Sequence, residues 1–247
     1  MKKLLLGSIV LAAVIAGPAI AAEMSVKAPV KAVAPPPAVY DWSGIYFGVH
    51  AGYAWSTFDA AFVGIPNFKV SPDVAIYGGQ MGIQRQFGNF VLGIEGSRST
   101  AVRHSYASTD CPPPNNLAFT CAAQFNDVLT VGPRLGWAMG EWMPYLTGGY
   151  ASATFPERIS IKAAPANPFG DRHRHNGSYI GGGVDKALWH GWIVGLDYRH
   201  YVLDNAHYVP VRFTAIGFPD PLIGAENTAK VSLDTIMLRL SLKLGPL

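Results

Sequence analysis

Hydrophobic and polar residues alternate with a period of two along most of the chain from Trp42 onward. In 42–55 one set of alternate positions is apolar, and the other set is small or polar. Successive side chains of a β-strand point to opposite faces, so this pattern predicts a strand with one apolar face. The same pattern predicts eight strands, over 42–55, 76–87, 90–102, 124–138, 142–155, 178–188, 192–201 and 231–244, although the two faces of 142–155 are ambiguous.

The connections between these strands alternate between long and short. Gly88 and Asn89 alone join the second strand to the third, a length and composition that suit a type II′ hairpin turn. The other short connections are 139–141 and 189–191, and the long ones are 56–75, 103–123, 156–177 and 202–230. Short turns at one end and long loops at the other are typical of bacterial outer-membrane barrels. We therefore predict an all-β fold over 42–247, an eight-stranded antiparallel up-and-down transmembrane β-barrel.

A soluble barrel or sandwich also has alternating strands, but three features favour the membrane. The polar faces are rich in Gly and Gln, which fit a narrow interior better than an outer surface. Arg85 and Lys186, which lie on apolar faces, are near short turns, where a long side chain reaches the head groups. Tryptophans occur at strand ends on the short-turn side, where aromatic rings form a girdle at the membrane boundary. They are Trp42, Trp137, Trp142, Trp189 and Trp192.

The polar faces also carry charges, which are expected to point inward: Glu95, Asp185 and Asp197 against Arg134, Arg199, Arg239 and Lys243. An eight-stranded barrel has an interior just wide enough for side chains to fill. A buried charge without a partner costs several kcal/mol. We therefore expect an interior salt-bridge network rather than a wide aqueous pore, with Arg134 and Arg199 against Glu95 and Asp197 and with Arg239 as a further member. This geometry disfavours a general porin.

The start of the chain indicates export from the cytoplasm. Residues 1–22 have a charged start, an apolar run at 4–16 and a small-x-small cleavage site at 19–21, which predicts a secretory signal peptide. The apolar run is shorter than the ~20 residues that a membrane-spanning helix needs. Residues 23–41 are rich in proline and predict a stiff leader in the periplasm.

Composition and charge exclude several classes of protein. Charged residues make up 14% of the chain, against about a quarter in soluble domains, and 27 residues are Gly. This excludes a disordered chain, a coiled coil and a disulfide-dense mini-protein. The net charge is +3, or +1 without Lys2 and Lys3. The basic patch that a nucleic-acid partner would require is absent.

Several short motifs resemble the small outer-membrane β-barrel family of alphaproteobacteria, which is often labelled porin-like and includes surface antigens and haem-binding members. The motifs are WSGIYFG at 42–48, GGQMG at 78–82, QFGNF at 86–90, GIEG at 93–96, GPRLG at 132–136 and PYLTGG at 144–149. The architecture of that family is similar to the transmembrane barrel of outer-membrane protein A.

The resemblance covers the whole mature chain. It implies no catalytic residue. From the strand pattern and the resemblance together we expect a monomer in the outer membrane of a Gram-negative bacterium, with structural and surface roles and with membrane lipid and the barrel insertion machinery as partners. The chain departs from the family at 197–201 and at its end. Family members usually end on an aromatic residue that the insertion machinery recognises, whereas this sequence ends on Leu247.

Cys111 and Cys121 are the only cysteines, and nine residues separate them within one long connection. In an exported chain a disulfide is the default state of such a pair. A metal site would need further ligands, and none are near in the sequence. We therefore expect a disulfide that staples this loop.

His173 and His175 offer the second functional hypothesis, haem binding through an outer loop. In a strand, His-x-His would place both rings on one face, as haem or metal ligation requires. The segment is predicted to be a loop, however, and a solvated basic loop is the commoner explanation. His50 is expected to be a packed interior residue. We predict no resident cofactor, with haem as the alternative.

The third hypothesis is a barrel enzyme that acts on lipid. It would need a Ser–His–acid constellation at the membrane-facing rim. Ser178 and His200 are present, but no spacing supports a triad. The chain has no phosphate-binding loop, CxxC or HExxH motif. We therefore predict that the protein is not an enzyme.

Overall fold

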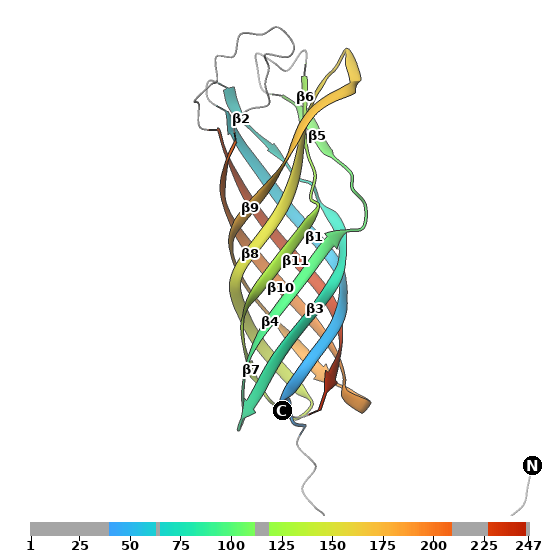
Figure 1. Ribbon diagram of the computed structural model, residues 1–247, viewed down its shortest axis with the longest axis vertical. Coiled ribbons are helices and arrows are strands. Elements are labelled where there is room, and N and C mark those ends of the chain that lie inside the picture. Colours follow the sequence, from blue (N-terminus) through green and yellow to red (C-terminus); the bar gives the residue numbers. More distant parts are fainter. Residues whose placement is uncertain (1–39, 63–64, 112–118, 209–226, 246–247) are drawn as a thin grey trace, which may run out of the picture. The chain divides into compact units, whose positions relative to one another are not determined.

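The computed structural model describes residues 40–62, 65–111, 119–208 and 227–245. An antiparallel sheet closes on itself to form a barrel (Figure 1). The eight strands of the ring are β1 (Gly44–Phe62), β3 (Val74–Phe87), β4 (Phe90–Ala101), β7 (Asp127–Trp137), β8 (Trp142–Ile161), β9 (Ala164–Ala187), β10 (Trp192–Tyr208) and β11 (Asn227–Leu244).

Each strand of the ring pairs with the strand that follows it, in the order β8-β7-β4-β3-β1-β11-β10-β9. Pairing of β8 with β9 and of β1 with β11 closes the ring. The predicted up-and-down barrel is confirmed. The predicted signal peptide, and the leader up to residue 39, lie outside the described residues.

Shorter elements extend the end of the barrel that carries the long connections (Figure 1). There β2 (Ile65–Val70) pairs with β1, and β5 (Ala107–Asp110) pairs with β6 (Phe119–Ala123), which pairs with the outer part of β8. At the opposite end, the short turn between β9 and β10 is a 3₁₀ helix, η2 (Trp189–Gly191). None of the helices in the described residues is long and apolar enough to cross a membrane.

The prediction of a loop over 156–177 is wrong. Strands β8 and β9 continue through this segment as a paired hairpin, with Pro156 opposite Arg172 and Phe155 opposite His173. The segment extends past the ring, so neither of its faces has to contact lipid. It therefore lacks the two-residue hydrophobic period of the other strands. Its strand structure comes from backbone pairing that continues upward from the barrel.

The two faces of the sheet have opposite character. On β3, Tyr77, Met81 and Ile83 are exposed on the outside, whereas Gln80 and Gln84 are buried on the inside. A soluble protein almost never buries charged residues while it exposes a continuous apolar surface. The outer face is therefore suited to acyl chains, and the predicted assignment of the faces is confirmed.

The turn between β3 and β4 also follows the prediction. Gly88 has a φ of +62°, and among the described non-glycine residues only His190 has a positive φ, so Asn89 has a negative one. A positive φ followed by a negative φ defines a type II′ turn, and glycine is favoured at its first central position. The turn pairs Phe87 with Phe90 at the strand ends.

Four of the five tryptophans predicted for the short-turn girdle are exposed on the outer face, and one is not. The four are Trp137, Trp142, Trp189 and Trp192. Trp42 is fully buried, so its assignment to the girdle is wrong. It precedes the first residue of β1 and shares the parity of the buried Tyr46, so its side chain continues the inward phase of the strand into the end of the barrel.

The barrel interior has three layers. Trp42 packs at the short-turn end with inward side chains of four strands and with Ala138, which follows β7, and we call this group the turn-end cluster. Its members are Trp42, Val91, Ala138, Met143, Ala187 and Ile193. A larger loop-end cluster lies toward the long connections and includes Ile76, Phe125, Phe155, Tyr179, Tyr201 and Leu233. Polar and charged residues occupy the stretch between the two clusters; on β10 the order along the strand is Ile193, then Asp197 and Arg199, then Tyr201.

Candidate functional site

The middle layer of the interior is a group of ion pairs centred on Glu95 of β4. Its carboxylate lies 2.7 Å from Arg199 Nη2 and 3.6 Å from Arg134 Nη1, and it also accepts a hydrogen bond from Arg239 Nη2. Asp197 lies 2.7 Å from Arg199 Nε and 3.2 Å from Arg239 Nη1. The structure thus brings together all five residues that the sequence placed in one network.

A sixth charged residue completes the group. Asp185 Oδ2 lies 2.5 Å from Arg134 Nη2. The alternation of 178–188 put Asp185 on the inner face but did not identify its partner. We use the name ionic network for Glu95, Arg134, Asp185, Asp197, Arg199 and Arg239. Three cations face three anions, and none of the six is more than 4% exposed.

Two tyrosines donate hydrogen bonds to carboxylates of the network. Tyr46 Oη donates to Glu95 Oε2 at 2.7 Å, and Tyr145 Oη donates to Asp197 Oδ2 at 2.6 Å. The guanidinium carbon of Arg134 lies 3.6 Å from the centroid of the Tyr145 ring, in cation–π geometry. Tyr145 was missed from the sequence, because the two faces of 142–155 could not be distinguished.

Glycines on the neighbouring strands give these tyrosines their space. A Cβ atom on Gly82 would lie 2.5 Å from the Tyr46 hydroxyl, and one on Gly183 would lie 2.6 Å from the Tyr145 hydroxyl. Both distances are far shorter than a van der Waals contact. Part of the glycine content of the inner face therefore serves the network directly.

Neutral polar residues surround the network toward the loop end. Arg199 Nη1 donates to Ser97 Oγ and to Thr130 Oγ1, both at 2.9 Å. His50 Nδ1 lies 2.7 Å from Gln80 Oε1, and its Nε2 lies 2.8 Å from Ser99 Oγ. Both ring nitrogens of His50 are thus engaged in the interior, which is the packed role expected for this residue.

The residues before β1 close the short-turn end. The Trp42 amide donates to Gln86 Oε1 at 2.8 Å, and its indole Nε1 donates to the Gly140 carbonyl at 3.2 Å. The Ser43 amide donates to the Asp41 carboxylate at 2.9 Å, and this hydrogen bond lowers the pKa of Asp41. Burial raises the pKa of Tyr40 to about 12. Tyr40 packs edge-on against Trp42, with ring centroids 4.8 Å apart.

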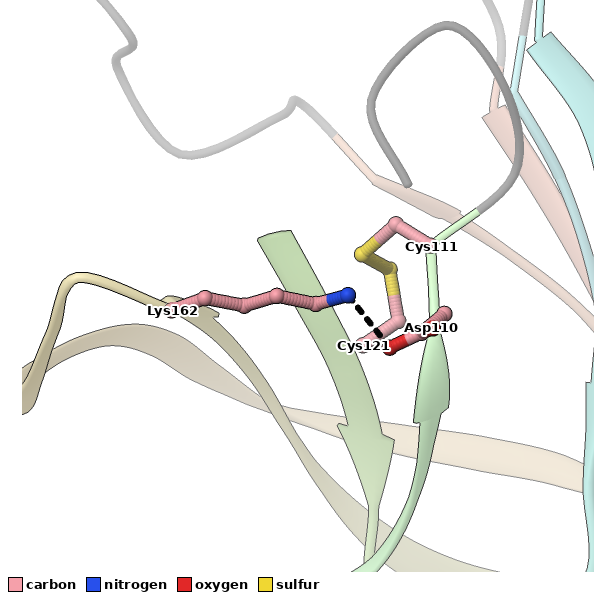
Figure 2. The surroundings of a disulfide bond; sticks show 4 residues. All are labelled: Asp110, Cys111, Cys121 and Lys162. Atoms are coloured by element: carbon pink, nitrogen blue, oxygen red, sulfur yellow. Dashed lines mark ion pairs between the residues drawn. A yellow bond between two sulfur atoms is a disulfide. The ribbon is translucent and has the colours of Figure 1, made fainter. Parts of the chain in front are cut away.

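The two cysteines form a disulfide between β5 and β6 (Figure 2). Cys111 directly follows β5, and Cys121 lies in β6 opposite Thr109. Beside the bond, Lys162 Nζ lies 2.7 Å from Asp110 Oδ1 and joins the tip of the β8–β9 hairpin to β5. The proline run 112–114 lies outside the described residues.

The proposed haem ligands lie on β9 and not in a loop. The side chain of His175 is 1% exposed, and its ring packs edge-on against Phe155 at a centroid distance of 5.8 Å. The side chain of His173 lies outside the described part of the chain. Among the described residues, no group of three or more His, Cys, Asp or Glu side chains could hold a metal ion.

Ser178 and His200 both lie on the outer face, on neighbouring strands. His200 Nδ1 lies 2.8 Å from Asp234 Oδ1, and Tyr198 Oη donates to the same oxygen at 2.6 Å. The register places Ser178 opposite Val202 and not opposite His200. The structure therefore supplies a histidine–carboxylate pair, but it does not place Ser178 directly across from it.

Comparisons with known proteins agree with this architecture. The family described as outer membrane protein beta-barrel domain matches residues 19–221. The 31 kDa outer-membrane immunogenic protein of Brucella melitensis is 29% identical over 85% of this chain and 91% of its own length. The 25 kDa outer-membrane immunogenic protein of Brucella canis is 26% identical over 78% of each chain.

Among solved structures, the chain is similar to Ail, the attachment invasion locus protein of Yersinia pestis. The identity is 11%, the TM-score is 0.38, and the match covers 81% of this chain and 99% of Ail. The family match spans most of the sequence, and the Brucella relatives are outer-membrane proteins of Gram-negative bacteria. This chain therefore belongs to the outer membrane β-barrel family, and its barrel lies in the outer membrane of a Gram-negative bacterium.

Proposed function

We propose that this protein has structural and surface roles in the outer membrane and that its barrel is closed to the diffusion of solutes. The observation that carries the proposal is the ionic network, which fills the interior between two apolar clusters. An eight-stranded barrel leaves an interior only wide enough for side chains. Because the network spans that interior, it occupies the path that a solute would take.

The energetics of buried charge also favour a closed interior. Opening a path would separate arginines from the carboxylates that they contact, and a buried charge that loses its partner costs several kcal/mol. Three cations balance three anions here, and Tyr46 and Tyr145 donate to two of the carboxylates. In the closed arrangement every carboxylate of the network contacts an arginine, and Arg134 Nε is the one network nitrogen that is buried without a hydrogen-bond partner among the described residues.

The end with the long connections supports the surface role. The β8–β9 hairpin extends beyond the ring, and the Cys111–Cys121 disulfide and the Asp110–Lys162 ion pair tie the neighbouring strands together (Figures 1 and 2). Loops on a rigid scaffold are where recognition residues concentrate. The relatives are named outer-membrane immunogenic proteins, which favours exposure of this end to the exterior.

We further propose that the protein acts as a monomer, with membrane lipid and the barrel insertion machinery as its partners. The eight strands of the ring pair on both sides, so their membrane-spanning parts leave no open edge for a second copy. The continuous apolar outer face supplies the contact with lipid.

Two other activities have less support. Haem ligation through His173 and His175 would require the buried ring of His175 to leave its contact with Phe155. A hemin titration with a Soret shift that His175→Ala abolishes would favour that role. Lipid hydrolysis would require a nucleophile beside His200, but the strand register places Ser178 opposite Val202. We therefore propose no enzymatic activity.

Liposome swelling tests the closed barrel directly. Liposomes that contain the folded protein are diluted into solutions of sugars of graded size, with a general porin as the positive control. We expect swelling rates equal to those of protein-free liposomes for every sugar. Swelling that slows with increasing sugar size would show a diffusion pore and would contradict the proposal.

A further inference from the structure

A cavity of about 310 Å³ opens on the outside of the barrel wall. Side chains from four adjacent strands, together with the residue that precedes β7, surround it. They are Arg98, Asn126, Asp127, Thr154, Arg172 and Arg174. The cavity is separate from the ionic network, and neither the closed lumen nor the surface role uses it.

The register shows that the cavity faces away from the interior. Arg98 lies opposite Leu129, which is exposed on the outer face. Asp127 has the same parity as Leu129 along β7, and it pairs with Thr154 on β8, which in turn pairs with Arg174 on β9. Residues that face each other across antiparallel strands share a face of the sheet. The cavity therefore opens toward the space that surrounds the barrel.

The cavity lies at the level where the apolar part of the outer face ends, on the side of the long connections. Directly toward the short turns, the outer face of the same four strands is apolar, with Ile94, Leu129, Tyr150 and Ile180 all exposed. Beyond these residues the outer face becomes polar. Tyr150 Oη and Ser152 Oγ both donate to Asn176 Oδ1 at 2.8 Å.

The distance along β4 agrees with this placement. Arg98 is eight residues beyond Phe90, which lies at the short turn. At ~3.3 Å per residue and a strand tilt of roughly 40°, Arg98 stands about 20 Å above that turn. The apolar band of such barrels is about 25 Å tall. The cavity thus begins near the level where acyl chains end and head groups begin.

The charge of the lining favours an anion. Three of the six lining residues are arginines and one is an aspartate, so the lining has a positive formal charge. Arg98 Nη2 lies 2.8 Å from Asp127 Oδ2, which holds its guanidinium at the edge of the cavity, yet 70% of the Arg98 side chain remains exposed. The planar arginine fork suits bidentate recognition of phosphate oxygens, and a phosphate monoester carries close to two negative charges at pH 7.

We propose that this cavity binds the phosphate monoester of a lipid head group in the outer leaflet. The position of the cavity favours a lipid over a free phosphate. The cavity opens sideways at the level of the head groups, directly above exposed apolar side chains. These side chains would contact the acyl chains of the same lipid molecule. Such a site would hold a lipid at a fixed place on the β4–β7–β8–β9 wall.

The test compares two variants of the folded protein in a neutral detergent. The first is Arg172→Gln with Arg174→Gln, which leaves the Arg98–Asp127 ion pair intact. The matched control is Arg85→Gln, an exposed arginine on the same outer face but near the short turns, where it lies over the Phe87 ring at 5.7 Å. Phosphatidic acid is the phosphate monoester probe, and phosphatidylcholine is the probe without a monoester. Native mass spectrometry measures the occupancy of each, and heat-modifiable gel migration verifies folding.

We expect one saturable phosphatidic acid site in the wild type, no saturable phosphatidylcholine site, and at least tenfold weaker phosphatidic acid binding in the Arg172/Arg174 variant, with the Arg85 variant unchanged. Equal binding to the wild type and to the Arg172/Arg174 variant would overturn the proposal. Inorganic phosphate serves as a competitor. Displacement of the lipid by inorganic phosphate at equal concentration would assign the site to the free anion and overturn the lipid assignment.

Discussion

Glu95 and Arg199 lie 2.7 Å apart although 104 positions separate them in the sequence. Glu95 is on β4 and Arg199 is on β10, and three strands lie between these two in the ring. The ion pair therefore reaches across the interior and does not run along the barrel wall. Arg239 on β11 makes a second contact to the same carboxylate from the far side. Contacts of this kind join opposite walls, so they determine both the stability of the barrel and the closure of its lumen.

Glu95→Gln should destabilise the protein strongly. The substitution leaves three arginines around a neutral amide, and the loss of one partner from a buried charge network costs about 3–5 kcal/mol. Urea unfolding in detergent micelles, followed by tryptophan fluorescence, measures the free energy of unfolding. Leu92→Ala on the outer face of the same strand is the control, and it should cost less because lipid or detergent fills the space. Equal effects of the two substitutions would contradict a central role for Glu95.

Tyr145→Phe should cost about 1.5–3 kcal/mol, the value of a hydrogen bond to a charged group. Its hydroxyl donates to Asp197 and also lies 3.0 Å from Arg239 Nη1, both in the buried interior. Tyr198→Phe is a matched control, because its hydroxyl also donates to an aspartate but on the exposed outer face. The free energy of unfolding should fall clearly less for Tyr198→Phe. A larger loss for Tyr198→Phe would indicate that burial does not strengthen the interior hydrogen bonds.

Trp42→Ala should remove the centre of the turn-end cluster and destabilise the protein by about 3–5 kcal/mol. Trp189→Ala removes a tryptophan that is 70% exposed at the same end of the barrel, and it should change stability little. Thermal unfolding in the same detergent compares the two. If both variants unfold at the same temperature as the wild type, packing around Trp42 does not stabilise this end of the barrel.

Reduction of the Cys111–Cys121 disulfide should act locally. The bond joins β5 to β6 beyond the ring, so the eight-stranded barrel does not depend on it. The double variant Cys111→Ser with Cys121→Ser should keep heat-modifiable migration and should be cleaved faster by protease between β5 and β6. The free energy of unfolding of the barrel should change little. Loss of heat-modifiable migration would show that the loop disulfide supports the whole barrel.

Much of this structure could be predicted from the alternation of residue types. A strand that contacts lipid on one side and packed polar residues on the other has a strict two-residue period, and β3 shows it over 77–83 and β11 over 235–242. The inward charges followed from the same period, and so did their need for partners. The inward position of Tyr145 could not be predicted, because Pro144 and the glycines at 148–149 interrupt the alternation that distinguishes the two faces of its strand.

Other features do not follow from this period. The outer half of the β8–β9 hairpin extends past the ring, so nothing imposes an apolar phase on it, and backbone pairing alone marks it as strand. Trp42, by contrast, does follow the period, because it shares the parity of the buried Tyr46, and only its residue type suggested the girdle. Asp185 was recognised as inward, but its pairing with Arg134 depends on the three-dimensional position of both strands.

Single-channel recording in planar lipid bilayers tests the closed lumen most directly. Because the ionic network spans the interior and an apolar cluster lies at each side of it, we predict no stable conductance steps from the folded wild-type protein across a wide range of voltage. Folding of the inserted sample is verified by heat-modifiable migration. Large, stable and reproducible conductance steps from that sample would contradict the account.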